Sequence, residues 1–326
     1  AYRKLTHADL ESLYAKLSGA QPSRGEFKDG LMAVLQHKNR ISARPDFGLL
    51  QVLRHTRLWS RNDQCVFWQQ HHFQAWLAKR DPATLDLRQF ADALKQVGWP
   101  VRQVAEACLA RNYTDHGPCE LLPSAGIWPF FAAHPEYIEE GLGLKPTEAR
   151  RYMEFELGLT LKVLGTFPVL PAAWIPRLLE IAMGEARSHR AAAQALLSGL
   201  PDIGARVLEA AGSGKQELKQ SALRWLAELD YRAAVPALRK MLAKESKELI
   251  RAELLATLEA LGDDISAELA PARLTAEAEA GLKAKLPADI AWFDFERLPT
   301  ARWQDGSAVA PVVPRAWVVL AAKFKT

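Results

Sequence analysis

The chain has 326 residues, 49% of them hydrophobic and 25% charged, which is the composition of a folded globular protein and excludes wholesale disorder. No apolar run reaches the roughly 18 residues of a membrane-spanning helix, and three cysteines are too few for a disulfide framework, so we expect no membrane span and a reducing compartment. The net charge of +4 is uneven: residues 1–80 carry 13 Lys and Arg against 6 Asp and Glu, so a surface facing a polyanion is expected near the N-terminus.

The beginning of the chain, Ala1 to Lys4, lacks an initiator Met and the apolar core of a signal peptide. We therefore interpret the chain as an excised segment of a cytoplasmic protein. From Leu5 to about Arg111 apolar residues recur at helical spacing, and no run alternates as a strand would. This part is predicted to be an irregular helical region.

Four helices are expected in the second half of that region, and the last starts at Pro100 and carries Cys108 on its apolar stripe. One follows Asp46, which is placed to cap it, and a long one begins at Asn62 or Asp63 and ends before Pro82. The third is closed by Gly98, because glycine accepts the backbone conformation that commonly ends a helix.

The helical pattern lapses from Asn112 to Pro123, and this stretch is expected to be a loop. An aromatic-rich connector follows from Ile127 to Leu144. Pro129 and Pro135 are expected to break it, because proline removes a helix hydrogen bond.

Two copies of one apolar pattern lie between Glu217 and Asp263. The second copy follows the first at a constant spacing, and the matched positions are Leu218, Ala222, Leu223, Leu226 and Leu229 with Ile250, Leu254, Leu255, Leu258 and Leu261. A second stripe runs from Ala234 to Leu242, so each unit is predicted to be two short amphipathic helices joined by a tight turn. One helix pair cannot bury its apolar face alone, so this repetition indicates a stacked array, which extends backward through degenerate units to about Leu161.

The end of the chain departs from this pattern. Aromatic residues crowd a proline-interrupted segment from Trp292 to Trp303, and a turn is expected at Gln304–Ser307. The aromatic tail is expected to cap the last apolar face of the array. Val309 to Leu320 is again apolar and helix-like, and the chain stops soon afterwards, which suggests a cut within a longer protein.

These patterns predict an all-α fold: a HEAT-like helical-repeat solenoid, an α-α superhelix with a right-handed twist, preceded by the irregular helical region. Three segments are expected: residues 1–123 as the N-terminal helical region, 124–286 as the repeat array, and 287–326 as an aromatic-rich C-terminal segment that starts a further domain or forms a cap.

Four blocks carry a resemblance to known families. Leu229-Asp-Tyr-Arg-Ala-Ala-Val-Pro-Ala-Leu238 resembles the short HEAT-like repeats of phycobilisome lyases. Three further blocks are Ile127-Trp-Pro-Phe-Phe131 with His134-Pro-Glu136, the repeats with Leu200-Pro201, and Leu298-Pro299 followed by Arg302-Trp303-x-Asp305-Gly306-Ser307. Together they resemble the middle of large bacterial proteins that often carry a WGR domain and are described as molybdate metabolism regulators. The resemblance implies a scaffold or regulatory role and transfers no catalytic residue.

No motif for catalysis or metal binding is apparent. The sequence has no G-x-S-x-G turn, no H-E-x-x-H helix and no complete phosphate loop, and Gly212–Lys215 is predicted to be a plain turn between helices. Cys65, Cys108, His116 and Cys119 lack the paired spacings of a structural zinc site. We therefore assign no catalytic, cofactor or metal residue, expect no cofactor or small-molecule substrate, and favour a non-enzymatic protein.

A basic, aromatic segment raises the alternative of nucleic-acid binding. The candidate polyanion-binding residues are Arg54, Arg57, Arg61, Lys79 and Arg80. They flank Trp59, Phe67, Trp68, Phe73 and Trp76, aromatics that could stack on bases if exposed. The spacing of these aromatic residues fits a stripe that faces the protein core better than it fits an exposed stacking surface. A helical-repeat enzyme acting on nucleic acid is a third alternative, which no motif supports.

The leading hypothesis is a cytoplasmic, non-catalytic scaffold or regulatory module. We expect it to bind a protein partner, or another domain of its own chain, through the surface of the solenoid. The less regular ends are expected to carry specificity, and the candidate interdomain contacts are Trp292, Phe293, Arg302, Trp303 and Asp305.

Overall fold

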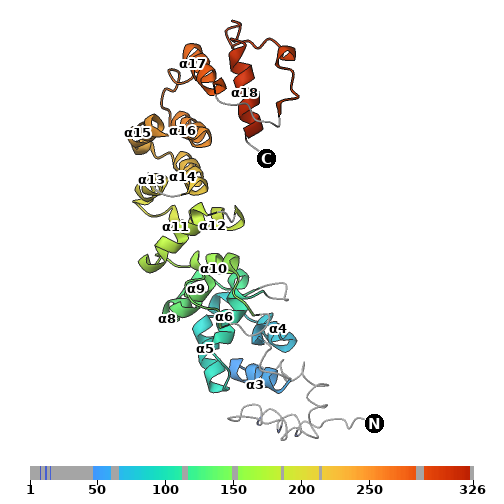
Figure 1. Cartoon of the computed structure of the whole chain (residues 1–326). Coiled ribbons are helices and arrows are strands. Elements are labelled where there is room, and N and C mark those ends of the chain that lie inside the picture. Colours follow the sequence, from blue (N-terminus) through green and yellow to red (C-terminus); the bar gives the residue numbers. More distant parts are fainter. Residues whose placement is uncertain are drawn as a thin grey trace. The chain divides into compact units, whose positions relative to one another are not determined.

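The computed structural model describes residues 47–59, 66–111, 117–148, 153–184, 187–212, 215–283 and 290–323, together with Ala8, Ser12 and Ala15. Every regular element in these ranges is a helix, which confirms the all-α prediction at this level (Figure 1). The described extended pairing consists of two isolated bridges, Ala110 with Phe155 and Arg302 with Ala308.

Contacts between helices divide the chain into two compact units. Unit 1 comprises residues up to Leu200, and unit 2 comprises those from Pro201 onward. This division differs from the three predicted segments: helices on both sides of residue 123 pack together in unit 1, where α8 lies against α5 and α10 against α6.

Unit 1 contains short helices joined by turns. Their bounds are α3 Leu49–Trp59, α4 His71–Leu77, α5 Leu87–Gln96, α6 Arg102–Leu109, α7 Pro118–Leu121, α8 Ser124–Ala133, α9 Pro135–Gly141, α10 Leu157–Leu164, α11 Ile175–Met183 and α12 Arg187–Leu197. Three 3-10 turns accompany them at Phe67–Gln69, Pro82–Thr84 and Ala172–Trp174. The predicted helix stop at Gly98 is confirmed, because this residue has a φ of 69° directly after α5.

The single long helix predicted from Asn62 or Asp63 to Pro82 is wrong in its described part. The 3-10 turn Phe67–Gln69 is separated from α4 by Gln70, whose backbone is extended with φ −80° and ψ 129°. The backbone N–H of Phe67 donates to the side chain of Gln103 at 3.2 Å instead of to a helix carbonyl. The break turns Phe67 and Trp68 into the core together, which one helical stripe would not do. Asp46, Asn62 and Asp63 lie outside the described residues.

An aromatic cluster forms the centre of unit 1. Phe67 lies edge-on to Phe73 with ring centres 4.9 Å apart, and Trp68 lies 5.2 Å from Phe73 and 5.9 Å from Phe90. All four side chains are fully buried. Such pairs add about 0.5–1.5 kcal/mol each beyond the burial of their apolar area, so this cluster is a principal source of stability for the unit.

The aromatic connector and the preceding loop are more helical than the sequence predicts. The expected loop contains the short helix α7, and the connector forms α8 and α9. Pro129 lies inside α8, which continues only to Ala133 beyond it, while Pro135 occupies the first turn of α9, where its missing N–H costs nothing. Buried Phe130 and Phe131 compensate for the lost hydrogen bond by packing into the core.

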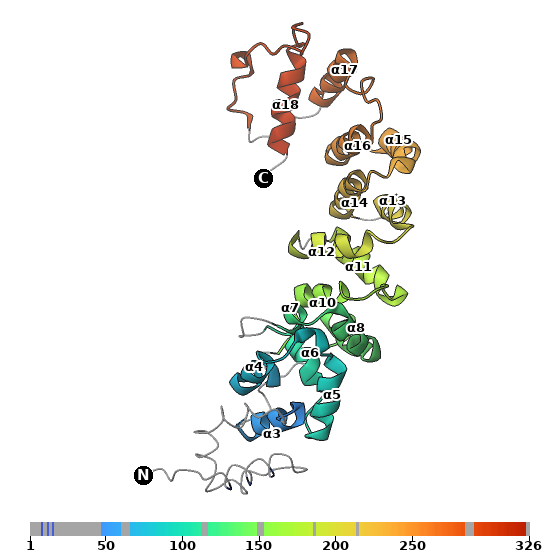
Figure 2. The same ribbon diagram turned by 180° about the vertical axis from the view of Figure 1, so that it is seen from behind.

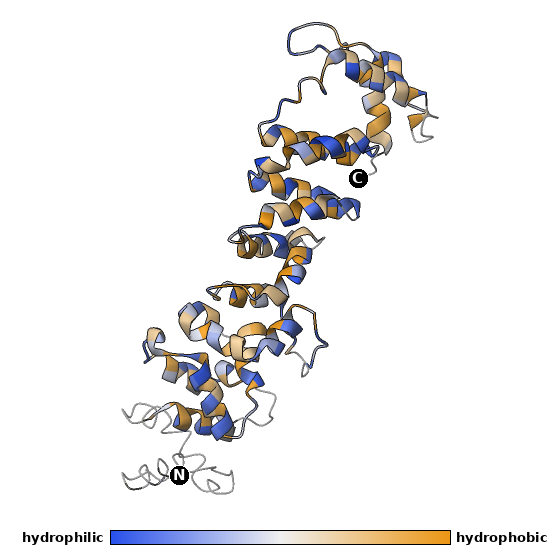
Figure 3. Ribbon diagram, turned by 90° about the vertical axis from the view of Figure 1, so that its left-hand side faces the viewer, coloured by the Kyte–Doolittle hydropathy of each residue, from blue (hydrophilic) through white to orange (hydrophobic). Residues whose placement is uncertain are grey.

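Unit 2 contains the two clear copies of the apolar pattern between Glu217 and Asp263, and the degenerate units predicted before them lie in unit 1 (Figure 2). Its helices are α13 Ile203–Gly212, α14 Gln216–Glu228, α15 Val235–Lys244, α16 Glu248–Ala260, α17 Pro271–Leu282 and α18 Val312–Lys323, with 3-10 turns at Arg232–Ala234 and Phe295–Arg297. Figure 3 shows polar and apolar residues alternating along these helices, as expected for amphipathic elements. The matched pairs Ala222 with Leu254 and Leu226 with Leu258 are fully buried, whereas Leu218, Leu229 and Leu255 are half-buried, so the repeat pattern coincides with the core in part.

The packed pairs do not coincide with the repeat units of the sequence. Helix α14 packs mainly against α13 and α16, and α15 packs against α16, whereas α14 has few contacts with α15, the helix that follows it in its own unit. The turn between α14 and α15 passes through Asp230, which has a φ of 46°, a conformation that a short polar side chain tolerates. The pairs α13–α14 and α15–α16 therefore join the second helix of one unit to the first helix of the next, and α14–α16 joins the first helices of two successive units.

The C-terminal segment packs on α17 through a small apolar core of Ala278, Val309 and Val313. The predicted turn at Gln304–Ser307 is confirmed: Gly306 has a φ of 86°, and the N–H of Trp303 donates to the carbonyl of Ser307 at 2.9 Å.

Candidate functional site

The predicted polyanion-binding residues occupy different environments. Lys79 is exposed, whereas Arg54 and Arg80 are half-buried. The side chain of Arg57, and Arg61 as a whole, lie outside the described residues. A shared basic surface near these residues therefore stays a prediction.

Arg80 is engaged at the edge of the unit 1 core. Its Nη2 atom donates to the carbonyl of Phe47 at 3.2 Å, and its guanidinium lies 5.0 Å from the ring centre of Trp76. The indole N–H of Trp76 donates to the same carbonyl at 3.1 Å. These contacts hold Arg80 in place, so it closes the core as well as carrying charge.

The aromatics of this segment are core residues wherever they are described. Phe67, Trp68 and Phe73 have no exposed surface, and Trp76 is 4% exposed. The core interpretation is confirmed for these four, and none of them presents a ring face on which a base could stack. The side chain of Trp59 is not described.

The predicted interdomain residues are brought together only in part. Arg302 donates to the carbonyl of Gly306 at 2.8 Å, and Asp305 accepts from the N–H of Ser307 at 2.8 Å, so both brace the turn. The hydrogen bonds that Asp305 accepts from the hydroxyl and the N–H of Ser307 lower the pKa of its carboxyl, and the hydroxyl is the larger cause. Trp303 packs against the small core of the segment.

Trp292 stands apart from that turn. It is 80% exposed and touches Phe293 with ring centres 5.8 Å apart, so it does not cover an apolar face of the array. The expected cap is instead supplied by helix α18 packing on α17.

A ladder of ion pairs joins successive helices of unit 2. Arg224 of α14 forms a bidentate pair with Glu253 of α16, at 3.0 and 2.7 Å. Three further contacts link other helices and turns of the unit: Lys219 with Glu245 at 3.8 Å, Arg239 with Glu268 at 3.4 Å and Arg251 with Glu277 at 3.3 Å. The partners of each pair belong to different helices or to the turns between them, so the ladder fixes the spacing of the stack rather than the shape of a single helix.

A buried hydroxyl supports the same stacking. Thr257 on α16 donates to the carbonyl of Glu253 in its own helix at 2.7 Å and lies 3.3 Å from the carbonyl of Leu223 on α14. The side chain is 2% exposed. The Arg224–Glu253 ion pair at the surface and the Thr257 hydroxyl in the core therefore support the same alignment of α14 against α16.

The outer sides of the array remain available to a partner. Along α15, Pro236, Lys240 and Lys244 are exposed, and Lys240 and Lys244 form no ion pair with any described residue. A stack of this kind buries one side of each helix and leaves the other as a broad surface. This surface is the candidate functional site.

Unit 1 contains a buried charge cluster that sequence reasoning missed. Arg102 makes two hydrogen bonds to Glu140, at 2.8 and 2.7 Å, and lies 3.4 Å from the fully buried Glu106. Its guanidinium also lies 4.6 Å from the ring centre of Phe155. The hydrogen bonds to Glu140 raise the pKa of Arg102. The cluster ties α6 to α9, and no local pattern reveals it because Arg102 and Glu140 are distant in the sequence.

Cys108 of α6 and Cys119 of α7, which were considered above as zinc ligands, lie close enough to form a hydrogen bond. Cys108 is buried, as predicted for a thiol on an apolar stripe, and Cys119 is half-buried. Burial raises the pKa of Cys108, whereas a hydrogen bond from Cys108, together with the charge of Lys162, lowers the pKa of Cys119.

Among the described residues, no group of three or more His, Cys, Asp and Glu is placed to hold a metal ion. Cys65 and His116 lie outside them, as do the side chains of His71 and His72. The expectation of no metal site stays a prediction. Within the same described ranges, none of the helices is long and apolar enough to cross a membrane.

Comparison with known proteins adds no assignment. The sequence matches no protein-family model and no curated protein, and the structure matches no solved structure. The resemblance to the WGR-domain proteins therefore rests on the three sequence blocks alone.

Proposed function

We propose that this chain is a HEAT-like solenoid segment that acts as a non-catalytic scaffold or regulatory module in the bacterial cytoplasm. It binds a protein partner, or another domain of its own chain, through the outer surface of its helix array. The observation that supports the proposal is the stacking of α14 on α16, in which the matched residues Ala222 and Leu254, and Leu226 and Leu258, are buried and Arg224 pairs with Glu253 across the two helices. Arrays built in this way use their extended surfaces for binding.

The three sequence blocks that resemble large bacterial WGR-domain proteins support the same role. Those blocks imply a regulatory protein with further domains. In such a protein a helix array holds its partner in a fixed position relative to the other domains. The right-handed superhelix and the interdomain role of residues 292–305 are parts of this proposal.

The test is copurification of the affinity-tagged full chain from nuclease-treated bacterial extract, followed by chemical cross-linking and mass spectrometry. We expect a reproducible protein partner cross-linked to exposed residues of α13–α16, and retained at about 0.5 M salt, where exposed charge contacts are screened. Reversing the charge of Lys240 and Lys244 together should reduce its recovery, because both are exposed on α15.

The contrary result has a definite form. The chain would recover no protein, and it would shift nucleic acid in a mobility assay with an affinity that falls steeply as salt rises. That outcome would favour the nucleic-acid alternative and direct attention to Lys79.

A further inference from the structure

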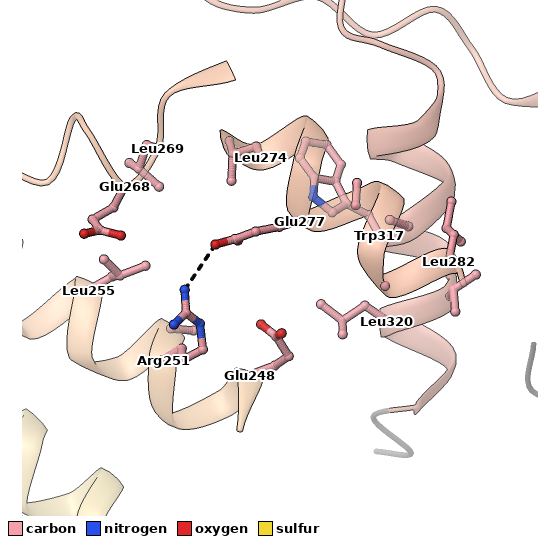
Figure 4. Close-up of a pocket in the computed structure, with 15 residues that line it drawn as sticks. Glu248, Arg251, Leu255, Glu268, Leu269, Leu274, Glu277, Leu282, Trp317 and Leu320 are labelled. Atoms are coloured by element: carbon pink, nitrogen blue, oxygen red, sulfur yellow. Dashed lines mark hydrogen bonds and ion pairs between the residues drawn. The ribbon is translucent and has the colours of Figure 1, made fainter. Parts of the chain in front are cut away.

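An open pocket of about 240 Å³ lies within unit 2, between α16 and the packed pair α17 and α18 (Figure 4). Its apolar lining comes from all three helices and the turn before α17, and includes Leu255, Leu274, Leu282, Val319 and Leu320. Helices α17 and α18 pack on each other, whereas α16 makes few direct contacts with either. The outer face of the last repeat helix is therefore left as one wall of a groove.

Two large apolar side chains stand exposed at this groove. Trp317 of α18 is 52% exposed and Leu269, just before α17, is 46% exposed. Figure 4 shows them on opposite sides of the pocket, with Leu274 between them. Single exposed apolar residues are ordinary on a protein surface, but a pair that lines one concavity marks a binding site.

The charged residues at the pocket are mostly acidic. Glu248, Glu268 and Glu277 line it, with Arg251 as the cation among them (Figure 4). Arg251 is already engaged: its Nη2 atom lies 3.3 Å from Glu277, and its Nη1 atom lies 3.4 Å from the carbonyls of Leu242 and Glu245. Its positive charge is therefore balanced within the protein.

The three carboxylates differ in how far they are neutralised. Glu268 is shared by Arg239 and Arg273, and Glu277 is shared by Arg251 and Arg273. Glu248 is exposed at the start of α16 and forms no ion pair with any described residue. Among the carboxylates that line the pocket, Glu248 is therefore the one left to pair with a cation of a partner, beside an apolar floor.

We propose that this groove binds a basic amphipathic helix of a protein partner. An apolar anchor side chain enters between Leu255 and Trp317, and a Lys or Arg side chain beside it reaches Glu248. The volume suits one large side chain better than a drug-sized molecule, whose pockets span about 300–1,000 Å³. An apolar floor with charges of one sign at its edge is the arrangement by which grooves take amphipathic helices of opposite charge. This inference rests on the proposed function.

The test uses the full chain and three fluorescein-labelled synthetic peptides, each long enough for about four helical turns. The first has Leu and Trp on one helical face and Lys on the other; the second replaces each Lys by Glu; the third keeps Lys and replaces Leu and Trp by Ser. Fluorescence anisotropy at about 0.15 M salt should show binding of the first peptide, and at least about tenfold weaker binding of the other two. A benzophenone at the anchor position should cross-link to α16, α17 or α18.

Two variants challenge the pocket, and one serves as a control. Gly281→Phe places a ring in the pocket from α17, where a Cβ atom would meet no atom within 4 Å, and it should abolish binding. Glu248→Lys should weaken binding about tenfold by placing like charges together. Glu259→Lys makes the same charge change on an exposed part of α16 away from the pocket, and it should leave the affinity within about twofold. Circular dichroism confirms that each variant is folded.

Equal binding of the Lys and Glu peptides, or binding unaffected by Gly281→Phe, overturns the proposal. So does a dimer of the chain that Gly281→Phe converts to monomer, because the occupant would then be a second copy. The proposed function fails separately. If Gly281→Phe still copurifies its protein partner while the peptides do not bind, the scaffold role stands without this groove; if no partner is recovered by any form, the scaffold role fails.

Discussion

At the scale of single residues, the buried charge cluster should govern the stability of unit 1. Glu140→Ala would remove both hydrogen bonds that Arg102 makes to a carboxylate whose side chain is only 5% exposed. Arg102 keeps the buried Glu106 as a charged partner at 3.4 Å, so the cost is that of losing hydrogen bonds to a charged group, about 1.5–3 kcal/mol. We expect that loss in the free energy of unfolding, measured by urea denaturation.

A matched control lies on the surface of the same unit. Asp92 pairs with Lys95 at 3.8 Å, and both side chains are more than half exposed. Asp92→Ala should change the unfolding free energy by less than about 1 kcal/mol, since exposed pairs contribute little. Equal losses for both variants would contradict the buried role of Arg102.

The two cysteines should differ in reactivity with pH. Because the hydrogen bond from Cys108 lowers the pKa of Cys119, its thiolate should form at lower pH than that of an ordinary thiol, whose pKa is about 8.5. Rates of iodoacetamide modification, followed by peptide mapping from pH 6 to 10, should show Cys119 reacting first and Cys108 last. Cys108→Ala should move the Cys119 midpoint upward. A midpoint that stays in place would show that the hydrogen bond is not the cause.

At the scale of elements, Gly204 shows how one helix of unit 2 meets a turn. A Cβ atom there would lie 2.5 Å from Cγ of Tyr231, the residue after the left-handed Asp230. Glycine to alanine in a helix is usually stabilising by about 1 kcal/mol, but Gly204→Ala should lower stability by about 1–3 kcal/mol because the ring must move. Thermal unfolding measures the difference.

Gly212 in the same helix provides the comparison. A Cβ atom at that position meets nothing within 4 Å, so Gly212→Ala should be neutral or slightly stabilising. A stabilising Gly204→Ala would mean that Tyr231 does not lie against α13 in solution.

Elements with a local signal were predictable from sequence. The burial of Leu226 and Leu258 at matched positions was predictable, because helical periodicity can be recognised from residues that are close in the sequence. The helix end at Gly98 and the turn at Gly306 were also predictable, because both positions need a residue that accepts positive φ. The break at Gln70 was missed, because a contact with Gln103, distant in sequence, decides where the N–H of Phe67 is satisfied.

At the scale of the whole molecule, the all-α class was predictable and the arrangement of surfaces was not. The groove at Glu248 and Trp317 combines residues that are distant in the sequence, and their proximity depends on how α18 returns to α17. The predicted basic surface near Arg54 also depends on side-chain placement, and Arg80 proves to be engaged with Phe47. Periodicity identifies which face of a helix is buried but does not reveal which distant helix covers it.

The offset between sequence repeats and packed pairs determines where this chain can be divided. A fragment of residues 201–326 keeps the contact between α13 and α14. A fragment of residues 215–326 starts at a sequence repeat and lacks α13, so α14 loses that contact. We expect the longer fragment to melt cooperatively by circular dichroism and the shorter one to lose cooperativity. Similar melting of both fragments would contradict the pairing. Because α14 also packs on α16, a unit for transplanting this array into another protein has to keep α13 to α16 together, and a graft cut at the boundary of the sequence repeat would lose the contact of α13 with α14.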